Sequence, residues 1–271
     1  MQSEVQTITM PSGRMLLREA WARYRRSWRL FVGITFFPFV GQVVYLVTAF
    51  FIHRNTFLAG KTTSLSLFLR ILQNPETLVL SMLYFALCIW SAAALIFASV
   101  KDGSLTVRGA YREAGRFILS YLWITVLVGF ITAAGFLLLI IPGILFTVWF
   151  SLALFIFAAE GVHGINALRK SKEYVRGKWW SIAWRIAFIF VTLFIFSFLV
   201  NFLGSIFALI SGFFLVPLVG AKVGATISVY GVIGVRIFSS MVSTLLFTPL
   251  AVLYMSSIYG YVRANLKVAY L

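Results

Sequence analysis

The sequence has few of the residues that build catalytic and metal centres. Its 271 residues include one cysteine, two histidines and seven acidic residues. A single thiol, Cys88, allows neither an internal disulfide nor a thiolate metal cluster. His53 and His163 lie at the ends of apolar stretches that would place them on opposite faces of a membrane, where they cannot share a metal ion. We therefore expect no metal and no cofactor.

Sequence signatures of catalysis are missing as well. The acidic residues are scattered, and no two of them have a spacing that indicates a pair of catalytic carboxylates. Neither a phosphate-binding loop nor a dinucleotide-binding glycine motif occurs in the chain. We do not expect an enzyme.

Apolar residues, by contrast, are unusually abundant. Hydrophobic residues make up 61% of the chain and charged residues only 11%, and the mean hydropathy is +0.98. Soluble domains are about 45–50% apolar, so an excess this large cannot be buried in one soluble core. We expect an all-α fold, a single polytopic membrane helical bundle over residues 1–271.

The apolar residues fall into runs of membrane-spanning length. A helix needs about 20 such residues to cross a hydrocarbon core about 30 Å thick. Six runs are predicted to span, at 30–52, 78–100, 118–141, 144–160, 181–203 and 237–261. The first run is too long for the apolar region of a signal peptide, so we expect it to be retained.

Two features between these runs concern backbone geometry. Only Pro142 and Gly143 separate the third and fourth runs, which predicts a tight turn and two antiparallel neighbouring helices. Residues 204–235 are apolar but interrupted by glycines. We interpret this segment as irregular or re-entrant, with an extension of the fifth helix or two further crossings as alternatives.

The basic residues indicate an orientation. The chain carries 23 Lys and Arg against seven Asp and Glu, a formal net charge of +16. With the N-terminus inside and six crossings, 18 of the 23 basic residues lie on the cytoplasmic side. The positive-inside rule therefore predicts that both termini lie in the cytoplasm. We expect the chain to lie in the plasma (inner) membrane of the cell. Charge that flanks spans in this way indicates contact with lipid headgroups rather than with nucleic acid.

Three of the basic stretches resemble one another. An amphipathic interfacial helix is predicted at 12–29, with Leu17, Trp21, Tyr24 and Trp28 on one face. Similar basic and aromatic stretches precede the third and fifth runs. An aromatic face at the acyl boundary and arginines among phosphates would suit an anionic leaflet. The predicted headgroup-binding residues are Arg25, Arg26, Arg112, Arg116, Arg169, Lys170, Lys172, Arg176 and Lys178.

Polar residues inside spans are costly and are therefore functional candidates. Glu160 closes the fourth run and Arg185 opens the fifth, so the two are candidates for an ion pair. Asn201 lies deep in the fifth run, where it can hydrogen-bond another helix. Arg236, with Lys222, flanks the glycine-rich segment and is a candidate for binding a phosphate.

A family resemblance is carried by residues 141–180. Ile141-Pro142-Gly143 is followed by an apolar run, Glu160-Gly161, Ala167-Leu168-Arg169-Lys170-Ser171 and Gly177-Lys178-Trp179-Trp180. This pattern resembles the bacterial family called the membrane domain of glycerophosphoryl diester phosphodiesterase. The sequence has no room for the catalytic domain that can follow in that family, so the resemblance implies a stand-alone membrane module that handles lipid, not phosphodiesterase activity.

Three functions remain open at this point. The basic stretches favour a protein that binds or moves phospholipids or lipid-linked intermediates, above all anionic phospholipids. The small-residue surfaces, such as Gly204 and Gly212, would also suit a structural or regulatory module that docks a membrane partner or a second copy of itself. A small-solute transporter is the third possibility, and it requires a polar cavity within the spans.

Overall fold

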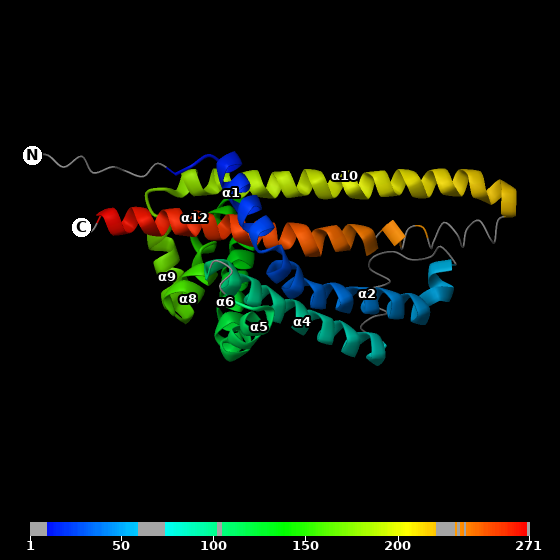
Figure 1. The fold of residues 1–271 in the computed structure, drawn as a ribbon, viewed down its shortest axis with the longest axis horizontal. Coiled ribbons are helices and arrows are strands. Elements are labelled where there is room, and N and C mark those ends of the chain that lie inside the picture. The colour runs from blue at the N-terminus through cyan, green and yellow to red at the C-terminus, as the bar shows by residue number, and fades with distance from the viewer. Residues whose placement is uncertain are drawn as a thin grey trace, which may run out of the picture. The chain divides into compact units, whose positions relative to one another are not determined.

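The structure is all-helical over the residues that it describes. This computed structural model describes residues 10–58, 74–101, 105–220, 231, 234–235 and 237–269. Figure 1 shows the path of the chain. The elements are α1 (Gly13–Arg26), α2 (Trp28–Leu58), α4 (Pro75–Val100), α5 (Val107–Arg116), α6 (Ile118–Leu138), α7 (Ile140–Phe150), α8 (Ala153–Glu160), α9 (Gly164–Val175), α10 (Trp179–Val219), the π-helical turn η1 (Ser243–Phe247) and α12 (Thr248–Ala269).

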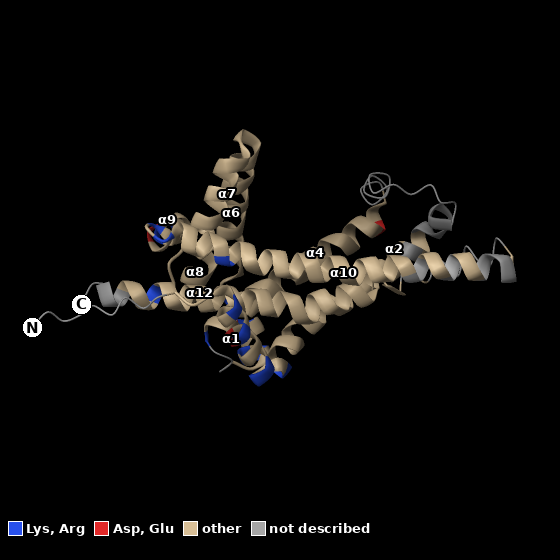
Figure 2. Ribbon diagram, turned by 90° about the horizontal axis from the view of Figure 1, so that it is seen from above, with Lys and Arg blue, Asp and Glu red and all other residues tan. Residues whose placement is uncertain are grey.

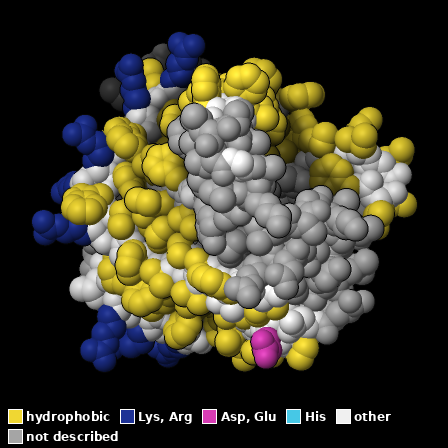
Figure 3. Space-filling model, turned by 90° about the vertical axis from the view of Figure 1, so that its right-hand side faces the viewer, with side chains coloured by type: hydrophobic (Ala, Val, Ile, Leu, Met, Phe, Trp, Pro, Cys, Tyr) yellow, Lys and Arg dark blue, Asp and Glu magenta, His cyan; other side chains and the backbone are white. Residues whose placement is uncertain are grey.

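Six helical stretches are long and apolar enough to cross a membrane, as the sequence predicts. They are Trp28–Ala49, Pro75–Val100, Ile118–Leu138, Ile140–Glu160, Trp179–Ile206 and Ile237–Leu266. Large apolar side chains remain exposed along them, including Phe130 and Phe190, and hydrophobic side chains cover much of the described surface on the face drawn in Figure 3. Apolar surface this extensive would be unstable in water. The chain is a multi-pass α-helical membrane protein.

The chain divides into two compact units. Unit 1 comprises residues 1–34, 89–192 and 248–271, and unit 2 comprises residues 35–88 and 193–247. The boundaries fall inside α2, α4 and α10, and at the junction of η1 with α12.

The core of unit 1 is built around α1 and α12. Leu16, Ala20 and Tyr24 of α1 are buried, as are Leu253 and Tyr254 of α12. Their spacing of four residues places the buried α1 side chains on one stripe of the helix. Close packing in this unit also depends on Gly33, because a Cβ atom there would lie 2.7 Å from the Val107 side chain of α5.

In unit 2, two pairs of helical segments pack together. The first pair is α2 with α4, and the second is α10 with the residues that lead into η1. The rings of Tyr45 and Tyr84 stack with centroids 5.8 Å apart. Gly41 allows this approach, since a Cβ there would lie 3.0 Å from the Leu87 side chain. On the other pair of segments, a Cβ at Gly204 would collide with the side chain of Val235.

The predicted hairpin exists, but its turn is not at Pro142 and Gly143. Helices α6 and α7 lie side by side (Figure 2), and Leu139 alone, in an extended conformation, separates them. Pro142 and Gly143 lie in the first turn of α7, where a backbone N–H has no helical acceptor and proline is tolerated. Gly143 packs against Phe136 and Gly135 of α6.

Two predicted boundaries also differ. The fourth span, predicted at 144–160, begins at Ile140 and consists of α7 and α8 with a break at Ser151 and Leu152. The segment 204–235 is not irregular throughout, because α10 continues as a helix to Val219. Forty-one residues of α-helix are about 60 Å long, roughly twice the hydrocarbon thickness. The rest of the predicted segment falls largely outside the described residues.

Candidate lipid-headgroup site

The three basic helices of unit 1 share one packing pattern. Each buries a stripe of residues spaced by four: Leu16, Ala20 and Tyr24 in α1, Ala110 and Ala114 in α5, and Ala167, Ser171 and Val175 in α9. The residue two positions before Ala20, Ala110 and Ser171 is an exposed arginine in every case, namely Arg18, Arg108 and Arg169. The pattern is equivalent in the three helices, in agreement with the similarity of their sequences.

The predicted bounds of the first of these helices need correction. The helix ends at Arg26, and Ser27 separates it from α2, so residues 12–29 are not one helix. Trp21 and Trp28 are exposed, at 42% and 51%, which is compatible with the predicted aromatic face towards lipid. Tyr24, which was predicted on the same face, is instead buried in the protein.

The predicted headgroup residues are spread over three helices and do not form one cluster. Figure 2 marks the positions of Lys and Arg in blue on the ribbon of α1 and α9, whereas α6 and α7 contain none. The basic side chains of Arg25, Arg26, Arg112, Arg116, Arg169, Lys172 and Arg176 are exposed, and those of Lys170 and Lys178 are partly buried. Three of them lie over aromatic rings: Lys172 at 4.4 Å from the Trp149 centroid, Arg116 at 5.5 Å from that of Phe117 and Lys170 at 5.9 Å from that of Tyr174.

Glu160 is the centre of a polar cluster between α8, α9 and α12. Its Oε2 atom lies 2.5 Å from Nζ of Lys170, and its side chain is only 9% exposed. Its Oε1 atom accepts hydrogen bonds from the hydroxyls of Tyr174, at 2.9 Å, and Tyr259, at 2.7 Å, and lies 3.5 Å from Nε of Arg263. Both oxygens of this carboxylate therefore face donors, which gives the cluster a structural role.

The cluster affects the titration of Tyr174, which lies on α9 outside the candidate spans. Burial, followed by its hydrogen bond to the Glu160 carboxylate, raises the pKa of Tyr174 to about 12. Burial disfavours the phenolate, and a second negative charge beside Glu160 would be repelled. The phenol therefore remains a hydrogen-bond donor to Glu160 over the physiological pH range.

The predicted ion pair between Glu160 and Arg185 is wrong. Arg185 instead donates hydrogen bonds to the backbone carbonyls of Met10, at 2.6 Å, Pro11, at 2.8 Å, and Ser181, at 2.5 Å. The Tyr254 hydroxyl donates to the Arg185 carbonyl at 3.0 Å. Arg185 thus fixes the chain before α1 onto α10 and α12, a role that required knowledge of the tertiary fold.

Of the other two polar candidates, Asn201 makes the predicted contact with another segment. Its Nδ2 atom donates to the Ser239 hydroxyl at 3.2 Å and to the Ser197 carbonyl, one turn back on α10, at 2.8 Å. The prediction for Arg236, and that for Lys222, falls outside the described residues.

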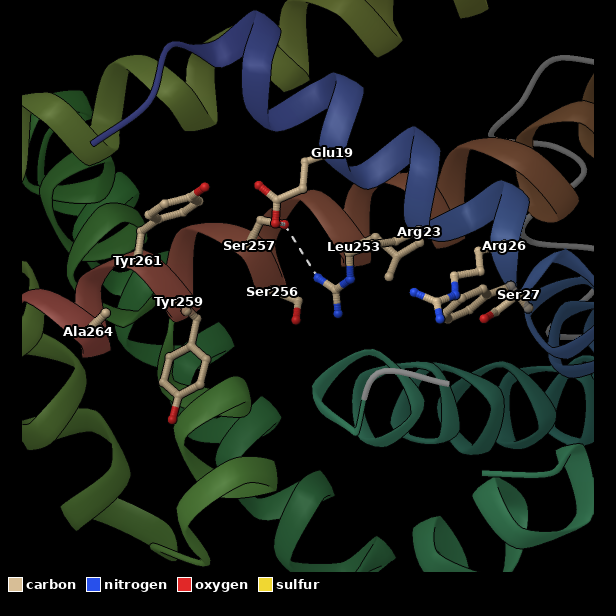
Figure 4. A pocket seen from close by; sticks show the side chains of 12 residues that line it. Glu19, Arg23, Arg26, Ser27, Leu253, Ser256, Ser257, Tyr259, Tyr261 and Ala264 are labelled. Atoms are coloured by element: carbon tan, nitrogen blue, oxygen red, sulfur yellow. Dashed lines mark hydrogen bonds between the residues drawn. The ribbon is translucent and has the colours of Figure 1, made fainter. Parts of the chain in front are cut away.

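A cavity of about 530 Å³ lies between α1 and α12 in unit 1. Figure 4 shows Glu19, Arg23 and Arg26 extending from α1, opposite Ser256, Ser257 and Tyr259 of α12. Of the predicted headgroup residues, only Arg26 lines this cavity. Two guanidinium groups and a carboxylate therefore share one space with several hydroxyl groups.

Arg23 and Glu19 are fixed in this cavity by hydrogen bonds. Arg23 donates to the Ser99 carbonyl at 2.6 Å, close to the end of α4, and to the Ser257 hydroxyl at 3.4 Å. Because the last carbonyls of a helix have no helical donor, a guanidinium at this position satisfies one of them. The Ser257 hydroxyl donates to Oε1 of Glu19 at 3.1 Å.

Arg26 differs from Arg23 in its surroundings. Its side chain is exposed at the rim of the cavity, and among the described residues none accepts a hydrogen bond from its guanidinium. A guanidinium with free donors beside an enclosed space is suited to a phosphate, which it can bind through two parallel hydrogen bonds.

Most of the residues that line this cavity could not be predicted from the sequence. Arg23 was recognised only as span-flanking charge, and Glu19, Ser256 and Ser257 were not singled out. The cavity residues of α1 are more than 200 positions away from those of α12 in the chain. Nothing in the local sequence of α12 distinguishes Ser256 and Ser257 from other small residues of a span. Their common site exists only because α1 packs on α12.

Comparison with known proteins gives no further assignment. No protein-family model matches the chain, and no curated protein or solved structure is significantly similar to it.

Proposed function

We propose that this membrane protein binds phospholipid headgroups in the cavity between α1 and α12. The observation that supports the proposal is the pairing of Arg26, which has donors free for a phosphate, with the Glu19 carboxylate in the same cavity. The resemblance of residues 141–180 to a bacterial lipid-associated membrane module agrees with it. In this proposal the bound lipid belongs to the cytoplasmic leaflet of the plasma membrane, with both chain termini inside.

Among the described residues, three charged side chains line the cavity, Glu19, Arg23 and Arg26. Because Arg23 already donates to Ser99 and Ser257, Arg26 and Glu19 define the kind of headgroup that fits best. A purely anionic headgroup would satisfy Arg26 but place negative charge near Glu19. A headgroup with a phosphate and a primary amine, as in phosphatidylethanolamine, can accept from Arg26 and donate to Glu19. We therefore expect the cavity to prefer phosphatidylethanolamine, and the exposed basic residues of α5 and α9 to contact anionic phospholipids less selectively.

Lipid titration of the purified full-length chain tests this proposal. Native mass spectrometry would count the bound lipids for phosphatidylethanolamine, phosphatidylcholine and phosphatidylglycerol with the same acyl chains. The Arg26→Gln variant should lose about tenfold in affinity for all three lipids, equivalent to about 1.4 kcal/mol. The Glu19→Gln variant should lose affinity for phosphatidylethanolamine alone, because only that headgroup carries an amine with N–H donors.

The matched control is Arg112→Gln. Arg112 is an exposed arginine of α5 that does not line the cavity. Equal losses in the Arg26→Gln and Arg112→Gln variants would show that lipids bind to the basic surface in general, and the proposed site would then be refuted. Because both arginines are exposed, neither variant should unfold, and their melting temperatures check this directly.

The partner-docking alternative makes a different prediction. It requires that lipid binding be unselective and that the chain be captured in a defined complex, with a second copy of itself or with another membrane protein. A single stoichiometry above one in the same mass spectra, together with indifference to headgroup, would favour that alternative.

A further inference from the structure

Unit 2 contains a second cavity, with a volume of about 650 Å³. Its described lining residues come from four helical segments, in α2, α4, α10 and residues 235–244. Most of these side chains carry hydroxyl or amide groups: Gln42, Tyr84, Ser197, Asn201, Ser205, Ser239, Ser240, Ser243 and Thr244. None of the described lining residues is charged.

The cavity lies in helices that are candidate membrane spans. Gln42, Tyr84, Asn201 and Ser240 all fall within these stretches. In hydrocarbon, a polar group without a hydrogen-bonding partner costs several kcal/mol, roughly 2–7 depending on the reference state. So many polar groups facing one space indicate that the space holds water or a polar ligand.

The hydrogen bonds within the cavity wall decide which ligand groups it can accept. The hydroxyl of Ser205 donates to the Asn201 carbonyl at 2.9 Å, and that of Ser240 donates to the Ile237 carbonyl at 2.9 Å. Thr244 donates to Oε1 of Gln42 at 3.5 Å. A hydroxyl has one proton and two lone pairs, so these three groups offer the cavity acceptor lone pairs and no proton.

Asn201 adds to this acceptor-rich surface. Both of its hydrogen bonds use Nδ2, with Ser197 and Ser239 as acceptors, which leaves Oδ1 as an acceptor. Donors line the cavity as well, because Gln42 and Ser239 accept hydrogen bonds through oxygen, which leaves the Gln42 amide N–H groups and the Ser239 hydroxyl proton for a ligand. The wall therefore suits an uncharged ligand whose hydroxyl groups can both donate and accept hydrogen bonds. A volume of about 650 Å³ is within the range of about 300–1,000 Å³ found for small-molecule sites.

The backbone beside the cavity is irregular. Ser243 and Thr244 belong to the π-helical turn η1. Such turns are uncommon, and they frequently occur at functional sites because they change the direction in which side chains project. We propose that this cavity binds an uncharged, polyhydroxylated small molecule, such as a sugar alcohol, within the membrane-spanning part of unit 2. This site is independent of the lipid site in unit 1, and it corresponds to the polar cavity that a small-solute transporter requires.

Cysteine accessibility tests whether the cavity is hydrated. In a full-length Cys88→Ser background reconstituted in liposomes, the Ser240→Cys variant would be compared with Met241→Cys, and Ser197→Cys with Phe198→Cys. Each pair consists of neighbours at the same depth, and the second member of each has an exposed apolar side chain outside the cavity lining. Because charged methanethiosulfonate reagents attack thiolates, which form in water and not in hydrocarbon, the cavity positions should react at least about tenfold faster.

Protection from the reagent then tests the class of ligand. Sorbitol should slow modification of the Ser240→Cys variant several-fold, whereas a linear polyether of similar length, which has acceptors but no O–H donors, should not. Gluconate supplies the charged comparison at equal osmolarity. Equal reaction rates within each pair of neighbours would overturn the hydrated cavity. Equal or better protection by gluconate or by the polyether would overturn the assignment to an uncharged ligand with several hydroxyl groups.

Discussion

At Glu160 a single carboxylate connects three helices, and its partners explain why it can be placed at the end of a span. Lys170 and Tyr174 come from α9, and Tyr259 and Arg263 from α12. A buried charge is tolerated when its lone pairs are satisfied, and the loss of that charge leaves two cations without their counter-charge. The sequence identifies Glu160 as unusual, but its partners are 10 to 103 positions away, so local patterns could not name them.

Replacing Glu160 by Gln should therefore destabilise unit 1. We expect a loss of about 2 kcal/mol, because Lys170 and Arg263 would then repel each other across a neutral amide. The change is measured as a fall in melting temperature in detergent. Glu113→Gln is the control, since its ion pair with Lys101 is more exposed than Glu160, at 26% for Glu113 and 41% for Lys101, and should contribute no more than about 1 kcal/mol. Equal effects of the two substitutions would contradict the structural role of Glu160.

Because of Tyr174, the contribution of this cluster to the folding stability should depend on pH in the alkaline range. Because its pKa in the folded chain, about 12, is above the value of about 10 for a free tyrosine, the folded state favours the protonated phenol. This contribution to stability is complete below pH 10 and is lost as the pH rises from about 10 to 12. The difference in melting temperature between the wild type and Tyr174→Phe should be constant below pH 10 and narrow above it. A difference that widens above pH 10 would contradict this assignment.

At the scale of helices, composition predicts the spans well and their ends poorly. Runs of apolar residues define all six candidate spans, because hydrocarbon imposes a minimum length on any helix that crosses it. The sequence pattern places the α6–α7 turn wrongly at Pro142. Proline stops a helix when it lies in the helix interior, whereas Pro142 lies in the first turn of α7. The continuation of α10 past Gly204 was not favoured because glycine weakens an isolated helix, whereas here Gly204 allows close packing against Val235.

The α6–α7 hairpin depends on a glycine contact. A Cβ added at Gly135 would lie 2.7 Å from the Phe146 side chain and 3.0 Å from Cα of Gly143. Gly135→Ala should therefore destabilise the hairpin by about 1–3 kcal/mol through overpacking. Gly129→Ala, on the same helix, has open space around the new methyl group and should be neutral or slightly stabilising. Thermal unfolding of both variants checks the prediction, and equal melting temperatures would contradict the packing of α6 on α7.

For the whole molecule, the distribution of charge gives an orientation that the helices alone do not define. The positive-inside rule predicts that α1, α5 and α9 lie together on the cytoplasmic side. In a Cys88→Ser background, the variants Arg25→Cys, Arg112→Cys and Arg176→Cys should react with a membrane-impermeant maleimide only after the cells are permeabilised. All three residues are exposed, so the reagent can reach them. Labelling of any of them in intact cells would contradict the proposed topology.

The site in unit 1 could be predicted from sequence only in part. Basic residues before a span indicate contact with headgroups, and Arg26 was predicted for that reason. The carboxylate and hydroxyl groups that make its surroundings selective come from packing between the two ends of the chain, α1 and α12. Contacts between such distant segments leave no periodic signal, so the selectivity that we propose for this site could be inferred only from the tertiary structure.

Photo-crosslinking with a phosphatidylethanolamine that carries a diazirine in its headgroup tests the central claim most directly. The purified full-length chain would be irradiated in nanodiscs, and the modified residues would be mapped by peptide mass spectrometry. Our account predicts that label concentrates on residues 19–31 and 253–264, and that the Arg26→Gln variant loses it. Label spread evenly over the ends of all the spans, unchanged by Arg26→Gln, would contradict it.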